Sequence, residues 1–253
     1  MKAHVAWLKA RRDRNRSTPP AIRWKSFLFA MATLVPLAML VLDAPLGAGA
    51  AQIAPFARTL GERITDFGKS DWILLVSVLL FFQALAASRI LATPRARVHA
   101  WFVSHAAFFL FTTIALSGLS VNLMKRIIGR ARPVYYEEWG IFGFSPFSGS
   151  RFESFPSGHA TTVGALFMTL ALLMPRHRLL FLILAIWFSM TRVMVSAHYP
   201  SDIIAGTVYG AWFTLMMAIV FSRYRILFKI APDGSPIPRQ PLLVSGSRTL
   251  AKS

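Results

Sequence analysis

Six long apolar runs divide this sequence, and they limit what the chain can fold into more than any other feature. An α-helix needs about 20 apolar residues to cross the hydrocarbon core of a bilayer, and each run is close to that length. Because lipid offers no partner to backbone polar groups, such runs cross a membrane as helices. The runs are Ser26–Leu46, Asp71–Ala92, Ala100–Leu123, Gly158–Met174, Leu179–Ala197 and Ile203–Phe221. The sequence therefore predicts an all-α integral membrane bundle of six transmembrane helices.

The charged residues lie mostly outside these runs. The formal net charge is +18, but Lys and Arg crowd the first 25 residues, the segment after Phe221, and the turns at 89–99 and 175–178. The positive-inside rule places these segments, and with them both chain ends, in the cytoplasm. Nearly all of the 10 acidic residues fall on the outer side. A basic membrane flank accounts for the positive charge, so no nucleic-acid partner is expected.

The chain is expected to have three parts. Residues 1–25 form a basic cytoplasmic segment, residues 26–222 the membrane domain, and residues 223–253 a basic, Pro-rich cytoplasmic tail that we expect to be disordered. The first run, with Ala48-Gly49-Ala50 after it, resembles a cleaved signal peptide, but the length of the run favours an uncleaved anchor. Residues 51–70 have the apolar spacing of an amphipathic helix that lies on the outer surface.

A first cluster of ionisable residues lies at the outer end of the third run, in Lys-Arg-Ile-Ile-Gly-Arg-Ala-Arg-Pro at 125–133. Lys125 and Arg132 are seven residues apart, which is close to two helical turns, so both can point to one face. Pro133 ends the helix there. A fixed cationic pair of this kind suits an anion with several oxygens.

The second cluster is Pro156-Ser157-Gly158-His159, where the fourth run begins. The start of a helix offers free backbone N–H groups and a positive dipole end, which together bind anions. Ser157 is expected to cap the helix or to bind a phosphate oxygen, and Gly158 lets the backbone approach closely. His159, in the first turn, is placed to give a proton to a leaving oxygen.

The third cluster joins the fifth and sixth runs. Arg192 lies within the apolar end of the fifth run, where a lone guanidinium is costly, so an anionic partner is expected. His198 and Asp202 are four residues apart, so the carboxylate can hold one ring nitrogen and leave the other free to attack. Taken alone, the same pair also fits a buried contact that only locks two helices together.

In this order the three clusters resemble the type-2 phosphatidic acid phosphatase family, whose pattern is Lys-x6-Arg-Pro, then Pro-Ser-Gly-His, then Ser-Arg-x5-His-x3-Asp. The matched motifs run from Lys125 to Asp202, and the six-helix frame extends the resemblance over nearly the whole chain except the tails. One position departs from the pattern, because Thr191 stands where the family has Ser. Threonine keeps the hydroxyl, but its contact is left open.

The resemblance implies a role for each matched residue. His198 attacks phosphorus to give a phosphohistidine that water hydrolyses, Asp202 orients His198, and His159 protonates the leaving alkoxide and later activates water. The phosphoryl oxygens are held by Lys125, Arg132, Arg192 and the backbone at Ser157 and Gly158. Because these donors supply the positive charge that phosphoryl transfer needs, no metal and no other cofactor is expected. The absence of cysteine separately excludes a thiolate nucleophile.

The expected function is removal of a phosphate or diphosphate headgroup from a lipid at the outer leaflet. Candidate substrates are phosphatidic acid, phosphatidylglycerophosphate, undecaprenyl diphosphate and lipid A phosphates. In a bacterium with two membranes the location would be the inner membrane, with the site facing the periplasm. A lipid-to-lipid phosphotransferase with the same intermediate and a non-catalytic lipid-phosphate binder are the alternatives. The related vanadium-dependent haloperoxidases are soluble, so the apolar runs argue against that use.

Two further features lie near the expected site. The loop Val134–Phe155 is rich in aromatic residues, a composition suited to the headgroup interface, and we expect it to dip into the membrane and help select the headgroup. Asp43, near the outer end of the first run, is expected to reach the interface, where contact with a basic site residue is possible. His105, within the third run, is expected to be structural.

Overall fold

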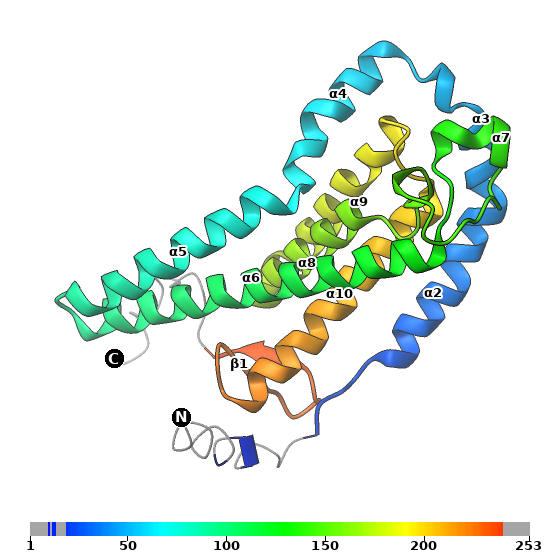
Figure 1. Cartoon of the computed structure of the whole chain (residues 1–253). Helices are drawn as coiled ribbons and strands as arrows, with labels where there is room; N and C mark the ends of the chain where they lie inside the picture. The colour runs from blue at the N-terminus through cyan, green and yellow to red at the C-terminus, as the bar shows by residue number, and fades with distance from the viewer. Residues whose placement is uncertain (1–9, 11, 14–18, 240–253) are drawn as a thin grey trace, which may run out of the picture.

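The computed structural model describes residues 10, 12–13 and 19–239, and over these it is a bundle of long helices (Figure 1). The helices along the membrane part are α2 (Trp24–Ala38), the π-helix η1 (Met39–Asp43), α3 (Ala44–Ala48), α4 (Pro55–Thr65), the 3-10 helix η3 (Asp66–Gly68), α5 (Ser70–Ile90), α6 (Pro94–Ile128), α7 (Tyr136–Trp139), α8 (Gly158–Leu173), α9 (Arg178–Met194) and α10 (Pro200–Arg223). Short 3-10 turns lie at Ala50–Gln52, Pro133–Tyr135, Ser150–Phe152 and Pro175–His177. Two strands, β1 (Phe228–Ile230) and β2 (Pro236–Pro238), follow α10.

By length and composition, five helical segments in the described part of the chain can cross a membrane: Trp24–Ala48, Pro55–Ile90, Pro94–Ile128, Pro175–Met194 and Pro200–Arg223. The fourth predicted run, Gly158–Met174, forms α8, which has only 16 residues. Most residues of α8 are buried, and it packs against α6, α9 and α10. A helix that is apolar all round and enclosed by other helices does not have to match the bilayer thickness itself. The predicted all-α membrane bundle is thus confirmed, with α8 as its short central helix.

Glycines hold α8 and α10 together at the end of the bundle where both helices begin. A Cβ on Gly164, Gly206 or Gly210 would come closer than 3.0 Å to backbone atoms of the facing helix. Since lipid tails give no hydrophobic drive for helix association, small residues that let backbones approach are what join membrane helices. This packing fixes the first turns of α8 and α10 relative to each other, and those turns carry His159 and Asp202.

Helix α6 is longer than the apolar pattern predicted. The third run was expected at Ala100–Leu123, but the helix has 35 residues and continues into the basic cluster as far as Ile128, where Gly129, with a φ of 64°, ends it in the left-handed conformation. The expectation that Pro133 ends this helix is therefore wrong, and Arg132 lies beyond the helix that carries Lys125. Lys and Arg are good helix formers, and their long side chains keep the charged group away from apolar surroundings. Hydropathy marks only the part of such a helix that lies in lipid.

The expectation of a disordered tail is wrong for residues 228–238. Strands β1 and β2 pair antiparallel, with Lys229 opposite Ile237. Phe228 is fully buried and its ring packs edge-on against Phe109, with 4.9 Å between the ring centroids. The prolines suggested disorder, but a two-stranded hairpin has only edge strands, which accept proline. Residues 240–253 of the predicted tail, and most of residues 1–18, lie outside the described residues.

The hairpin also binds the segment before α2. The backbone N–H of Ala21 donates to the carbonyl of Gly234 at 2.9 Å. The described parts of the two chain ends therefore meet at one end of the bundle, away from the loops that follow α6 and α9 (Figure 1). This matches the expectation that both ends lie on one side of the membrane.

The amphipathic helix expected at residues 51–70 is shorter in the structure, where α4 covers Pro55–Thr65, and its buried face is not the apolar one. Gly61 and Thr65 are buried, whereas the ring of Phe56 is 79% exposed. Helix α4 packs on α9 through these small residues. An apolar stripe marks the buried face of a helix in water, but in lipid it also suits the outward face, so the pattern alone did not identify the packed side.

We predict that Gly210→Ala destabilises the bundle, because the added Cβ meets the Thr161 carbonyl across the α8–α10 contact. Overpacking of this kind costs about 1–3 kcal/mol of unfolding free energy. The matched control is Gly118→Ala in α6, where nothing lies within 4 Å of the added Cβ. Thermal unfolding in detergent should show a lower midpoint for Gly210→Ala only; equal midpoints for both variants would contradict the packing.

Candidate active site

The three sequence clusters meet at one end of the bundle. Helices α6 and α9 end there, and α8 and α10 begin there (Figure 1). The connecting loops lie beside α3 and α7 at the same end (Figure 1). The eight predicted site residues all lie at this end, namely Lys125, Arg132, Ser157, Gly158, His159, Arg192, His198 and Asp202.

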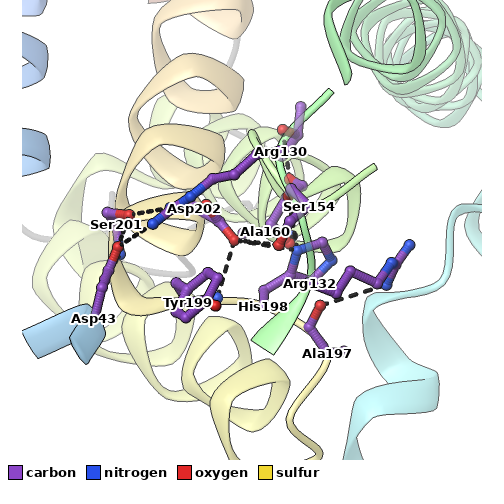
Figure 2. A network of polar contacts seen from close by, with 12 residues as sticks. Asp43, Arg130, Arg132, Ser154, Ala160, Ala197, His198, Tyr199, Ser201 and Asp202 are labelled. Atoms are coloured by element: carbon purple, nitrogen blue, oxygen red, sulfur yellow. Dashed lines mark hydrogen bonds and ion pairs between the residues drawn. The ribbon is translucent and has the colours of Figure 1, made fainter. Parts of the chain in front are cut away.

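Arg130 lies at the centre of the polar network in Figure 2, with its side chain fully buried. One terminal nitrogen donates to Asp202 Oδ1 at 2.5 Å and to the Ser201 hydroxyl at 2.7 Å, and the other donates to Asp43 Oδ2 at 2.8 Å. The guanidinium also donates to the Ile141 carbonyl. A buried charge is tolerated only when it is paired and hydrogen-bonded, and Arg130 meets both conditions.

Sequence reasoning missed Arg130, which lies between the two motif residues Lys125 and Arg132. Its main chain is held on both sides, since Arg130 pairs with Phe144 in an isolated β-bridge and its carbonyl accepts from the Ser154 N–H at 3.0 Å. The signal in the sequence that could have identified Arg130 was Asp43, the acidic residue in the first apolar run. A buried carboxylate in a membrane helix needs a cationic partner, and that partner is Arg130.

Asp43 is in the π-helix η1, where the first transmembrane helix departs from regular α geometry. Single π-turns inside α-helices occur frequently at functional sites. Besides Arg130, the carboxylate accepts from the backbone N–H of Ser201 at 3.0 Å and from its hydroxyl at 2.5 Å. Asp43 therefore joins the first transmembrane helix to the first turn of α10, and the possible contact with a basic residue near the site is confirmed.

Asp202 is fully buried and holds several donors besides Arg130. Its Oδ2 accepts from the Ser154 hydroxyl at 2.5 Å and from the Tyr199 N–H at 2.9 Å, which caps α10. The ring of Tyr199 covers the guanidinium of Arg130, with 4.3 Å from Arg130 Cζ to the ring centroid. These contacts fix the carboxylate in one orientation beside His198 (Figure 2).

His198 is held differently from what the sequence suggested. Its Nδ1 donates to the Ser154 carbonyl at 2.8 Å, whereas Asp202 Oδ2 lies 3.7 Å away, beyond hydrogen-bond distance. The carbonyl requires a proton on Nδ1, so in the neutral ring Nε2 carries the free lone pair. Asp202 acts on the ring through its charge and through Ser154, because the Ser154 hydroxyl donates a hydrogen bond to the Asp202 carboxylate. The interaction between His198 and Asp202 is thus mediated by Ser154, which sequence reasoning missed.

His198 is only 3% exposed. Burial lowers the pKa of His198 to about 4, although Asp202 acts in the opposite direction. The imidazole is therefore neutral at physiological pH, which is the form that can act as a nucleophile.

The start of α8 brings the first two clusters together. The Ser157 hydroxyl caps the helix by accepting from the Ala160 N–H at 3.3 Å, as predicted, and the Ser157 N–H donates to the Asp202 carbonyl at 3.0 Å. A Cβ on Gly158 would lie 3.5 Å from the Lys125 Nζ, so the ammonium lies directly beside this glycine. A lysine charge and the positive end of a helix dipole thus face the same space.

Two arginines complete the cationic surroundings. Arg132 donates to the carbonyls of Ser150 at 2.9 Å and Ala197 at 3.4 Å, so it lies next to His198. Arg192 donates to the Thr65 hydroxyl at 2.9 Å, and its buried Nε has no partner among the described residues. The expected anionic partner of Arg192 is not seen as an ion pair in the described part of the chain.

The loop between α6 and α8 lies over this end of the bundle. Its exposed aromatic side chains include Trp139, Phe142, Phe144 and Phe147. The loop is anchored through the bridge from Phe144 to Arg130 and an ion pair of 3.5 Å between Glu153 and Arg126. A loop that presents aromatic rings outward beside a cationic site suits the membrane–water interface.

We predict that Asp43→Asn destabilises the protein strongly. The amide cannot balance the charge of Arg130, and its NH₂ group would face the donors of Arg130 or Ser201. Breaking a buried ion pair on one side costs about 3–5 kcal/mol. Asp71→Asn is the matched control, because Asp71 is exposed at the start of α5. If both variants unfold in detergent at the wild-type temperature, the buried pair is not what stabilises this end.

A second prediction concerns pH. Above the ordinary histidine pKa of about 6.5, His198 is neutral in both the folded and the unfolded chain, so it adds no pH dependence. Below that value the unfolded chain takes up a proton that folded His198, with its pKa lowered to about 4, does not. Stability is therefore lost as the pH falls between these two values, by up to about 3 kcal/mol. Unfolding midpoints measured from pH 7 to 4.5 should fall more steeply for the wild-type protein than for His198→Gln; parallel curves would contradict burial of the neutral ring.

Comparison with known proteins finds similar proteins of one family. The sequence model of the PAP2 superfamily matches residues 106–226 of this chain. A lipid A 1-phosphatase of Rhizobium johnstonii is 52% identical over 241 residues, which cover 95% of this chain and 98% of that protein. A lipid A 1-phosphatase of Rhizobium etli is 52% identical over 222 residues, covering 87% of this chain and 95% of that protein.

A solved structure supports the fold. The crystal structure of a transmembrane PAP2-type phosphatidylglycerolphosphate phosphatase from Bacillus subtilis matches with a TM-score of 0.53 at 18% identity, over 78% of this chain and 92% of that one. The family resemblance inferred from the three motifs is confirmed by the near-full-length identity and by the match over α8, α9 and α10. This chain belongs to the PAP2 superfamily.

Proposed function

We propose that this membrane lipid phosphatase removes the phosphate at position 1 of lipid A or of a closely similar acylated sugar phosphate. The observation that carries the proposal is the 52% identity to a lipid A 1-phosphatase across 98% of that protein's length. The site supports the same chemistry, because a neutral histidine faces several cationic groups at one end of a membrane bundle. Position 1 of a sugar is its anomeric carbon, so the leaving group is a sugar hydroxyl.

In the proposed mechanism the Nε2 lone pair of His198 attacks phosphorus. His159 enters this step as an imidazolium, a form that the negative charge of the bound phosphate favours. The P–N bond forms as the bond from phosphorus to the sugar oxygen breaks, and the leaving oxygen takes the Nδ1 proton of this imidazolium, which leaves a neutral ring. Positive charge develops on the His198 ring in this step. The Asp202 carboxylate, 3.7 Å from Nδ1, and the Ser154 carbonyl, 2.8 Å from it, stabilise that charge. Water then attacks the phosphohistidine, gives its proton to His159, and releases inorganic phosphate.

The phosphoryl oxygens are held by Lys125, Arg132 and Arg192 and by the first N–H groups of α8. The N–H of Ala160 is already taken by the Ser157 cap, so those of Gly158 and His159 remain for the substrate. Phosphoryl transfer depends mainly on positioning and on charge stabilisation, which this set of donors supplies. The enzyme is metal-independent, and EDTA therefore leaves the reaction intact.

The proposal also includes the orientation of the protein in the membrane. The described chain ends meet away from the site, and the basic residues near them favour the cytoplasm. The site then faces outward, which in a bacterium with two membranes is the periplasmic side of the inner membrane. The residues 1–25 and those after 222 belong to the cytoplasmic part. The aromatic loop between α6 and α8 lies at the outer interface and contacts the headgroup.

We predict that the purified protein releases inorganic phosphate from lipid A in detergent with EDTA, and does so faster than from phosphatidic acid, phosphatidylglycerophosphate or undecaprenyl diphosphate. His198→Ala should lower kcat by about 10³-fold or more, since it removes the nucleophile. The matched control is His105→Ala, because His105 contacts the Trp101 carbonyl within α6 and touches no site residue; it should keep its activity.

Each other outcome has a clear meaning. Phosphate release that survives His198→Ala would refute the nucleophile. Transfer of labelled phosphate to a second lipid, without release of inorganic phosphate, would make the chain a phosphotransferase. Binding of lipid A with neither release nor transfer would leave a lipid-phosphate binder.

A further inference from the structure

Thr65 lies in a part of the chain that carries none of the three motifs, yet it contacts two of them. It is the last residue of α4, just before η3, and only 7% of it is exposed. Helix α4 reaches from the end of α3 to the start of α5 and passes over the ends of the central helices (Figure 1). The corner formed by α4 and η3 therefore covers one side of the site.

The carbonyl of Thr65 contacts His159. It lies 2.5 Å from His159 Nε2, and a carbonyl can only accept, so Nε2 carries a proton. In the neutral ring the lone pair is then on Nδ1, which has no hydrogen-bond partner among the described residues. Thr65 thus selects one of the two tautomers of the second histidine.

The two histidines are held in opposite tautomers by the same kind of contact. His198 gives its Nδ1 proton to the Ser154 carbonyl and presents Nε2, while His159 gives its Nε2 proton to the Thr65 carbonyl and presents Nδ1. One ring nitrogen of each is tied to main chain, and the other is left for the reaction. In catalysis the orientation of a histidine is set by the partner of its non-reacting nitrogen.

The side chain of Thr65 contacts Arg192. Its hydroxyl accepts from an Arg192 terminal nitrogen at 2.9 Å and lies 3.3 Å from the Thr191 hydroxyl. The contact of Thr191, the position at which the chain departs from the family pattern, was left open; its hydroxyl donates to the Phe188 carbonyl at 2.7 Å and also reaches the Thr65 hydroxyl. With one end of the guanidinium held by Thr65, the buried Nε–H that has no described partner keeps a fixed direction.

Two glycines let the corner approach this closely. A Cβ on Gly68 would lie 2.5 Å from His159 Cδ2 and 3.1 Å from Val163, and one on Gly61 would lie 2.9 Å from the Met194 Cβ. Gly68 therefore contacts the imidazole directly. There is no room beside the ring for a larger residue unless the ring moves.

We propose that Thr65 is a positioning residue of the active site, which holds His159 through its carbonyl and Arg192 through its hydroxyl. The inference rests on the proposed phosphatase function. As the imidazolium, His159 gives its Nδ1 proton to the leaving oxygen, and the neutral ring that results takes a proton from water at Nδ1. Nε2 keeps its proton in both forms of the ring, so the bond to the Thr65 carbonyl persists through the whole reaction, and only one nitrogen exchanges protons.

The test separates the two contacts with three variants and a control. Gly68→Ala displaces the His159 ring, Thr65→Val removes the hydroxyl that holds Arg192, and Thr65→Ser restores a hydroxyl. Gly118→Ala is the control, because the same substitution meets nothing within 4 Å. Each is assayed with lipid A, and with phenyl phosphate and p-nitrophenyl phosphate as probes of similar size. Nitrophenolate is a much weaker base than phenolate, so it leaves with little help from an acid.

For Gly68→Ala, kcat/KM should fall by about 10-fold or more with phenyl phosphate and much less with p-nitrophenyl phosphate, because a displaced acid matters only for a poor leaving group. The ratio kcat/KM is the correct measure, because it reports only the steps from free enzyme and substrate up to departure of the leaving group. Thr65→Val should raise KM by about 10-fold for both probes, as expected when a charge-assisted contact to phosphate is lost. Thr65→Ser should return KM close to the wild-type value.

A purely structural role of the corner would lower activity with both aryl phosphates alike, and that result for Gly68→Ala overturns the inference about His159. Equal KM values for wild type and Thr65→Val, or no recovery in Thr65→Ser, overturn the inference about Arg192. Unfolding midpoints identify a variant that has not folded. If Gly68→Ala does not fold, Thr65→Val still tests the proposal, because valine keeps the shape of the threonine side chain. Failure of the wild-type protein to release phosphate from any lipid refutes the proposed function instead.

Discussion

The ion pairs of Arg130 are the interaction on which the rest of the site depends. One buried guanidinium joins Asp43 in the first transmembrane helix to Asp202 in the last one, across 87 and 72 residues of sequence. Both carboxylates also lie at the first turn of α10, where the positive dipole end favours negative charge. Replacing such a network by apolar residues often costs little stability. The network matters here for geometry. Asp202, which orients Ser154 and acts on His198, cannot move without leaving a buried charge unpaired.

Around this fixed carboxylate, the main chain does most of the positioning. The Ser154 carbonyl holds His198, the Thr65 carbonyl holds His159, and the Asp202 carbonyl holds the N–H of Ser157 at the start of α8. Backbone groups are set by the packing of the helices, and the α8–α10 contact is too close to slide because glycines lie in it. In the proposed mechanism, side chains therefore supply the charge and the proton transfer, while helix packing supplies the distances. Preorganisation of this kind avoids rearrangement during the reaction.

The sequence predicted the parts of this arrangement that local patterns record. Hydropathy identified the apolar helices, and the three motifs named His198, His159 and the cationic residues, which the structure brings to one end of the bundle. Arg130 and Thr65 were missed because their partners lie far away in sequence, and no local pattern reports such a contact. The packed face of α4 was missed for another reason: in lipid, small residues such as Gly61 mark the buried side, and exposed rings such as Phe56 face outward. The β1–β2 hairpin was missed because prolines were weighed above the buried ring of Phe228.

In the proposed mechanism the same His159 nitrogen serves the leaving sugar oxygen in the first step and the attacking water in the second. The residues that bind phosphate are indifferent to which acceptor arrives, so they do not decide between hydrolysis and transfer to another lipid. That choice depends on what can occupy the space beside His159 once the first product has left. The corner at Thr65 and Gly68 covers the Nε2 side of the ring, so an acceptor can exchange a proton with His159 only at Nδ1. Helix packing outside the three motifs therefore determines from which side of His159 the acceptor of the second step arrives.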